Sequence, residues 1–140
     1  MERYSVLHKL GFGDHSTTWL ARDEIGLCYR ALKVLSADES TKSTELRMLQ
    51  QLAAIRSDDR GKRAIRLPKT YFRFEGPNGQ HICLLNEVAY ASLQGLYTIE
   101  GCNFTPGARR LRADIARKVI RQVTEAVNFL HSHRVCHGGK

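Results

Sequence analysis

The sequence has few prolines, few cysteines and no long apolar run. Three prolines and eleven unevenly spaced glycines in 140 residues exclude a collagen-like or low-complexity chain. No stretch approaches the roughly 18 consecutive apolar residues of a membrane span, so we expect no membrane contact. The first residues lack the apolar core of a secretory signal. We therefore expect an intracellular protein, in the cytoplasm or the nucleus.

Neither the cysteines nor the histidines show a familiar metal-binding pattern. The four cysteines lie 19 to 55 residues apart: Cys28, Cys83, Cys102 and Cys136. This spacing lacks the CxxC pairs of zinc sites, so we predict free thiols in a reducing compartment. A short cluster near the C-terminus contains His131, His133, Cys136 and His137. Its spacing also matches no usual ligand set, and we predict no metal site.

The residues that are present suit one globular domain with a basic surface. Hydrophobic residues make up 42% of the chain and charged residues 26%. The net charge is +8, from 22 basic and 14 acidic residues. A basic chain favours acidic partners, but no nucleic-acid-reading motif accompanies the basic clusters. Nucleic acid is therefore the least favoured partner, and we interpret the basic helix residues as a solvated face.

The hydrophobic pattern predicts five strands in two groups. Residues 4–9, 16–22 and 27–35 are rich in β-forming side chains and are separated by turns. Residues 70–74 and 81–88 flank a further turn at 76–79. Residues 38–43 are polar and are assigned to no helix or strand, and we expect a charged loop at 57–62.

Two helices are predicted from apolar residues at steps of three and four. The first follows Ser43 or Thr44 as its N-cap and carries Leu46, Leu49, Leu52 and Ala53. The second runs from about residue 109 to 133, with one apolar stripe: Leu111, Ile115, Val119, Val123, Val127 and Leu130. This stripe is larger than a small sheet can cover, so we expect another domain or a partner chain on residues 111–130.

A glycine-containing turn and a lysine–glutamate pair are the candidate chemical features. The segment Gly11-Phe12-Gly13-Asp14-His15-Ser16 precedes strand-like residues, so the turn joins two strands and could cover nucleotide phosphates. Lys33 lies in the third strand, and Glu45 on the following helix could steady its ammonium group. Each feature alone is equally compatible with an ordinary hairpin or a solvated surface.

In this order, the features resemble the small N-terminal lobe of a protein kinase. The resemblance is carried by Leu10-Gly11-Phe12-Gly13, by Arg30-Ala31-Leu32-Lys33 and by Thr44-Glu45-Leu46. Residues 76–88 make it similar to the serine/arginine-protein kinases, particularly the fungal ones. The resemblance implies an α+β fold: a five-stranded antiparallel sheet with one helix over about residues 4–90. The first long helix of a C-lobe would follow over about residues 91–140, making the whole chain a partial kinase domain.

The resemblance also implies a role for each matching position. Lys33 would contact the α- and β-phosphates of ATP and be held by Glu45. Asn86 would be a polar gatekeeper where an apolar residue is common, and Glu87 and Ala89 would present backbone groups to adenine. The implied nucleotide-binding set is Leu10, Gly11, Phe12, Gly13, Asp14, His15, Ser16, Thr17, Thr18, Ala31, Lys33, Asn86, Glu87 and Ala89.

The implied reaction is transfer of the ATP γ-phosphate, with Mg²⁺, to serine or threonine of Arg/Ser-rich proteins. The most serious departure from the family pattern is Gly139, which in His137-Gly138-Gly139-Lys140 stands where the catalytic aspartate belongs. The 140 residues contain no D-F-G segment either, so the magnesium ligands would lie in missing C-lobe residues. We therefore expect a truncated domain that is inactive alone. The alternative is a catalytically dead fragment that binds a nucleotide or, through residues 111–130, a protein.

Overall fold

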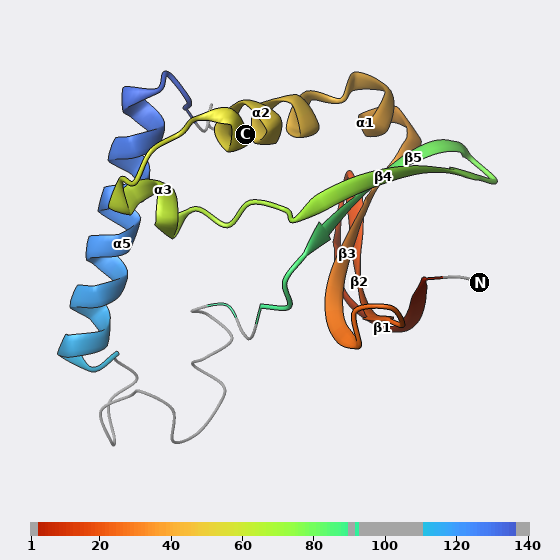
Figure 1. Ribbon diagram of the computed structural model, residues 1–140, viewed down its shortest axis with the longest axis horizontal. Coiled ribbons are helices and arrows are strands. Elements are labelled where there is room, and N and C mark those ends of the chain that lie inside the picture. The colour runs from red at the N-terminus through yellow and green to blue at the C-terminus, as the bar shows by residue number, and fades with distance from the viewer. Residues whose placement is uncertain (1–2, 90–91, 93–110, 137–140) are drawn as a thin grey trace. The chain divides into compact units, whose positions relative to one another are not determined.

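The computed structural model describes residues 3–89, 92 and 111–136. The chain forms two compact units, residues 1–55 with 67–89 and residues 56–66 with 90–140 (Figure 1). The first unit has nine basic and nine acidic residues, and the second has thirteen basic and five acidic residues. The net charge of +8 therefore belongs entirely to the second unit.

The first unit is built on one antiparallel sheet of order β1-β2-β3-β5-β4 (Figure 1). The strands are β1 (Tyr4–Gly13), β2 (Ser16–Asp23), β3 (Cys28–Leu35), β4 (Thr70–Gly76) and β5 (Gly79–Asn86). Two helices of this unit follow β3 in the chain: α1 (Ala37–Lys42) and α2 (Thr44–Ala54). The predicted α+β fold with a five-stranded antiparallel sheet is confirmed.

Each face of the sheet has its own apolar cluster, as the alternation of strand side chains requires. On one face, Leu35, Ile82 and Leu84 pack with Leu46 and the half-buried Leu49 of α2. The other face carries a cluster of Ala21, Leu32, Cys83 and Leu85. Helix α2 thus covers the face that Leu35 and Leu84 share, and this is also the face of Lys33.

The second face is closed by aromatic side chains from both edges of the sheet. Tyr4 of β1 and Phe72 of β4 stack with 5.7 Å between ring centroids and 4° between ring planes. Because β1 and β4 are the two edge strands, this contact requires the sheet to curl over the cluster between them.

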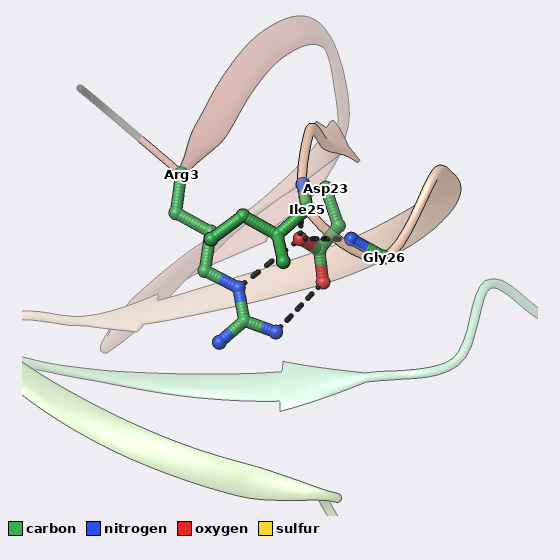
Figure 2. A network of polar contacts seen from close by, with 4 residues as sticks. All are labelled: Arg3, Asp23, Ile25 and Gly26. Carbon is green, nitrogen blue, oxygen red and sulfur yellow. Dashed lines mark hydrogen bonds and ion pairs between the residues drawn. The ribbon is translucent and has the colours of Figure 1, made fainter.

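A buried carboxylate holds the start of β1 against the turn between β2 and β3 (Figure 2). Asp23 is 1% exposed and receives two hydrogen bonds from Arg3, Nε to Oδ1 at 3.1 Å and Nη2 to Oδ2 at 2.9 Å. The backbone N–H groups of Ile25 and Gly26 also donate to Oδ1, at 3.2 and 3.0 Å. The hydrogen bonds from Arg3 are the main cause that lowers the pKa of Asp23 to about 2.

The polar residues 38–43, for which no helix was predicted, form most of α1. Ser36 caps this helix: its hydroxyl accepts a hydrogen bond from the N–H of Glu39 at 3.3 Å. The pattern of serine followed three residues later by glutamate is a helix-start signal, so the sequence did contain the information. The helix predicted after Ser43 or Thr44 is confirmed as α2, but its N-cap Ser43 makes no side-chain capping bond to it.

The second unit contains α3 (Arg60–Ala64) and the long helix α5 (Ala113–Ser132). The predicted charged loop at 57–62 was wrong in part, because Asp59 caps α3 by accepting the N–H of Gly61 at 2.6 Å. The long C-terminal helix is confirmed, although residues 109 and 110 lie outside the described residues. Gly61 is buried and packs on α5 at Phe129, which is itself 3% exposed.

The predicted apolar stripe of α5 is partly exposed. Val123 and Val127 are 56% and 41% exposed, and Ile120 beside them is 65% exposed. Leu111, Ile115, Val119 and Leu130 are half-buried. Phe129, the buried contact of this helix with α3, was not part of the predicted stripe.

Candidate functional site

The centre of the candidate site is an ion pair between β3 and α2. The Nζ atom of Lys33 lies 2.6 Å from Oε1 and 2.9 Å from Oε2 of Glu45. Glu45 lies in the first turn of α2, where the helix dipole favours a negative charge. The two side chains are 32% and 29% exposed, so solvent screens the pair and its contribution to stability is small. The ion pair with Glu45 holds the ammonium group of Lys33 in place on the sheet and leaves it accessible.

The strand register places several predicted residues on the same face as Lys33. Thr18 of β2 and Leu84 of β5 pair with Lys33 on either side. Two residues along β3, Ala31 pairs with Asn86. Since positions two apart on a strand share a face, Thr18, Ala31 and Asn86 surround the lysine. Ala31 is 7% exposed, and the Asn86 side chain donates from Nδ2 to the Leu84 carbonyl at 3.3 Å.

The glycine-containing turn is the hairpin between β1 and β2. Gly11 pairs with Thr18 and Gly13 with Ser16, and β1 extends through Gly13, beyond the predicted strand end at residue 9. A Cβ at either glycine would meet no atom within 4 Å, so both glycines border open space. Around them, Leu10, Asp14 and His15 are exposed, and Ser16 and Thr17 are half-buried.

Phe12 at the hairpin is 80% exposed and does not join the face of Lys33. It pairs with Thr17, next to Trp19 on the opposite face of the sheet. The Nζ atom of Lys9 lies 4.3 Å from the centroid of the Phe12 ring and 6.0 Å from that of Trp19. In this arrangement Phe12 offers only its backbone to a ligand beside Lys33.

The predicted adenine-binding segment follows β5 directly. Glu87 and Ala89 are both exposed, outside the paired part of the sheet. The Glu87 carboxylate is bound by Lys69, with 2.8 Å between Nζ and Oε1. This ion pair engages the side chain, whereas the predicted role of Glu87 concerns its backbone carbonyl. His137 and Gly139 lie outside the described residues.

Prediction from the sequence missed two buried polar residues in the first unit, Asp23 and Ser40. Ser40 is 2% exposed, and its hydroxyl accepts the N–H of Ile82 at 2.8 Å. The signal that could have found it is the helix-start pattern of Ser36 and Glu39, which places Ser40 on α1.

Among residues 3–89, 92 and 111–136, no three histidine, cysteine, aspartate or glutamate side chains gather where they could hold a metal ion. In those ranges no helix has both the length and the apolar composition needed to cross a bilayer.

Comparison with known proteins finds similarity to protein kinases over most of the chain. Protein kinase dsk1 of Schizosaccharomyces pombe is 34% identical over 132 residues, which cover 92% of this chain and 23% of that protein. SRSF protein kinase 3 of Mus musculus is 31% identical over 134 residues, or 93% of this chain and 22% of its own length. Over more than nine tenths of its length, the chain is thus similar to proteins named as protein kinases, one of them an SRSF protein kinase. The predicted resemblance is thereby confirmed.

A further similar protein carries the name of a serine/threonine protein kinase. A serine/threonine protein kinase of Aspergillus fumigatus is 32% identical over 130 residues, covering 93% of this chain and 31% of that protein. The chain therefore spans less than a third of the length of these three relatives. No protein-family model matches the chain.

Proposed function

We propose that the sheet and α2 form the ATP-binding lobe of a serine/threonine protein kinase. The observation that carries this proposal is the bidentate ion pair of Lys33 with Glu45, on the face bordered by the glycine hairpin. In this role Lys33 binds the α- and β-phosphates, and Glu45 holds its ammonium group in place. The backbone N–H groups of the hairpin cover the phosphates.

The chemistry of the neighbouring residues supports this role. Ala31 beside Lys33 is small, which suits the approach of a flat base to the sheet. Leu10 and Thr18 supply apolar atoms around that base, and the backbone of Glu87 and Ala89 supplies a carbonyl acceptor and an N–H donor for its edge. Asn86 adds a polar group at the back of the same face.

Titration with a fluorescent ATP analogue in the presence of Mg²⁺ tests the proposal on the full chain. Loss of an ammonium–phosphate contact lowers affinity by about tenfold or more, so we expect this loss in Lys33→Ala. Lys42→Ala is the matched control, because Lys42 is 63% exposed and its ion pair with Glu39 is 3.9 Å long. Equal affinity of the Lys33→Ala and Lys42→Ala variants would contradict the assigned role.

The reaction that we propose for this lobe is transfer of the ATP γ-phosphate to serine or threonine of Arg/Ser-rich proteins. It rests on relatives named as serine/threonine or SRSF protein kinases. Magnesium would accompany ATP, with ligands beyond the described residues. Residence in the cytoplasm or the nucleus stays a prediction from the sequence.

We further propose that these 140 residues do not transfer phosphate by themselves. Gly139 offers no carboxylate where, in the resembled kinases, an aspartate accepts the proton of the substrate hydroxyl. A phosphate-transfer assay with an Arg/Ser-rich peptide is expected to stay at the background of the Lys33→Ala variant. Transfer above that background would overturn this part of the proposal.

A second candidate function is binding of a protein partner along α5. It is favoured by the exposure of Ile120, Val123 and Val127, which are 65%, 56% and 41% exposed. Light scattering after size exclusion tests it. Self-association or capture of a defined partner that is lost in Val123→Glu would support it, and a monomer that retains no partner would count against it.

A further inference from the structure

The hydroxyl of Ser40, in α1, accepts a backbone hydrogen bond from β5 just beyond the paired residues of β3 and β5. The two strands pair from Ala31 opposite Asn86 to Val34 opposite Cys83. The next N–H on β5 towards β3 belongs to Ile82, which is 0% exposed and would otherwise lack an acceptor. The Ser40 hydroxyl accepts this N–H at 2.8 Å, so α1 is fixed to β5 by a buried hydrogen bond (Figure 1).

The side chain of His81 makes a second contact between β5 and the segment that leads from β3 into α1. The backbone carbonyl of Leu35, the last residue of β3, lies 2.9 Å from Nδ1 of His81. One residue later, the N–H of Ser36 donates to the carbonyl of His15 in the glycine hairpin at 2.8 Å. The junction where α1 begins is therefore bonded both to β5 and to the candidate phosphate-binding turn.

Helix α1 is joined to α2 by one residue, Ser43, so the position of α1 fixes where α2 begins. The Ser43 backbone is in the left-handed region with φ of 54°, which a residue with a Cβ adopts only when its surroundings impose it. Two hydrogen bonds to α1 do so: the Ser43 N–H donates to the Glu39 carbonyl at 2.9 Å, and the Ser43 hydroxyl donates to the Ser40 carbonyl at 2.6 Å. Glu45 is only two residues further on.

We propose that Ser40 is a positioning residue for the ion pair of Lys33 with Glu45. This inference rests on the proposed function, because it concerns how the phosphate-binding lysine is held. Leu46 and Leu49 pack α2 on the sheet, but apolar contacts have no preferred direction. The hydrogen bond to Ile82 is directional, and through Ser43 it sets where the first turn of α2 begins. It therefore decides whether the Glu45 carboxylate reaches Lys33.

The test uses Ser40→Ala, with Ser40→Cys as a second variant that keeps the volume but weakens the acceptor. Thr41→Ala is the matched control, because the exposed Thr41 hydroxyl donates only to the Ala37 carbonyl of its own helix. Two quantities are measured in the full chain without nucleotide. Amide hydrogen exchange of Ile82 reports the hydrogen bond, and the rate of Lys33 acetylation relative to Lys42 reports how firmly Glu45 holds the ammonium group.

We expect the Ser40 variants to exchange the Ile82 amide faster and to acetylate Lys33 several-fold faster, approaching the rate in Glu45→Gln. In the Glu45→Gln background, Ser40→Ala is expected to add nothing, since the ion pair is already absent. Faster Ile82 exchange with an unchanged Lys33 rate would reduce Ser40 to a purely structural role and overturn the inference. An unchanged Ile82 rate would overturn it as well.

Two features keep the outcome interpretable. Cys83 is 1% exposed, so continued protection of its thiol shows that a variant is folded. If Ser40→Ala loses this protection, it is not folded, and the Ile82 exchange rate and the Lys33 acetylation rate of Ser40→Cys are used in its place. Because neither readout needs nucleotide, a failed ATP titration would refute the proposed function without deciding the role of Ser40.

Discussion

The rings of Tyr4 and Phe72 stack almost parallel, 5.7 Å apart, although they come from the two edge strands of the sheet. The contact lies over the cluster that contains Ala21 and Cys83. It closes the face of the sheet opposite to the candidate site. Aromatic packing on this face therefore stabilises the curvature of the sheet, whose opposite face carries Lys33.

Removing one ring of this pair should destabilise the first unit. We expect Tyr4→Ala to lower the free energy of unfolding by about 1–2 kcal/mol, because a half-buried aromatic pair and its apolar contact area are lost. Tyr29→Ala is the matched control, since Tyr29 is 59% exposed and should change stability by less than about 0.5 kcal/mol. Urea denaturation followed by Trp19 fluorescence measures both. Equal midpoints for the two variants would contradict the stacking role.

The Arg3–Asp23 contact predicts a pH dependence of stability. The pKa of Asp23 is lowered from its ordinary value of 3.8 to about 2, first by the hydrogen bonds from Arg3 and then by the N–H of Gly26. A lowered carboxyl pKa means that the folded state favours the charged form. The resulting stability is complete above about pH 4 and is lost as the pH falls towards about 2.

Asp23→Asn should therefore be less stable than the wild type at pH 7, and the difference should shrink between about pH 4 and pH 2. Denaturation midpoints measured across this range test it. Glu24→Gln is the control, because Glu24 is an exposed neighbour whose ion pair with Arg22 is 3.5 Å long. A gap between wild type and Asp23→Asn that stays constant down to pH 2 would contradict the assignment.

The fold was largely predictable because alternation and helical periodicity are local signals. All five strands and both long helices were found from side-chain patterns. The failures were the short helices α1 and α3, which carry little apolar periodicity and were not predicted. Their caps, Ser36 and Asp59, were the available signals.

The candidate site was predictable only for those residues that the order of the sequence motifs identifies. Lys33 and Glu45 were paired from the resemblance, and their side chains meet in the structure. The orientation of Phe12 was not predictable, because it depends on irregularities of register in β1 between Val6 and His8 and between Lys9 and Gly11. The acceptor role of Ser40 was equally hidden, since it depends on a tertiary contact with β5.

The thiol of Cys83 should be unreactive in the folded protein. Burial raises the pKa of its thiol to about 12, which lowers the thiolate fraction about 1,000-fold below that of an ordinary thiol. Cys136, in contrast, is exposed. We expect a thiol-reactive label at pH 7.5 to modify Cys136 within minutes and Cys83 only after denaturation, as seen by peptide mass spectrometry. Modification of both at similar rates would show that the cluster around Cys83 opens readily.

Gly61 of α3 packs directly against the backbone of α5. A Cβ at this position would lie 2.7 Å from the Cβ of Phe129 and would clash with the backbone carbonyl of Glu125. Because neither of these groups is the flexible end of a side chain, the helices would have to move apart. We expect Gly61→Ala to destabilise the second unit by about 1–3 kcal/mol, as overpacking of a buried contact usually does.

Gly13→Ala is the matched control, since its Cβ would meet no atom within 4 Å. Hydrogen exchange of the α5 amides around Phe129 separates the two variants. Exchange should accelerate in Gly61→Ala and stay at the wild-type rate in Gly13→Ala. If Gly61→Ala leaves these amides as protected as before, α5 does not depend on α3 for its stability. In that case the apolar side chains of α5, and not the close approach at Gly61, would have to hold the helix in place.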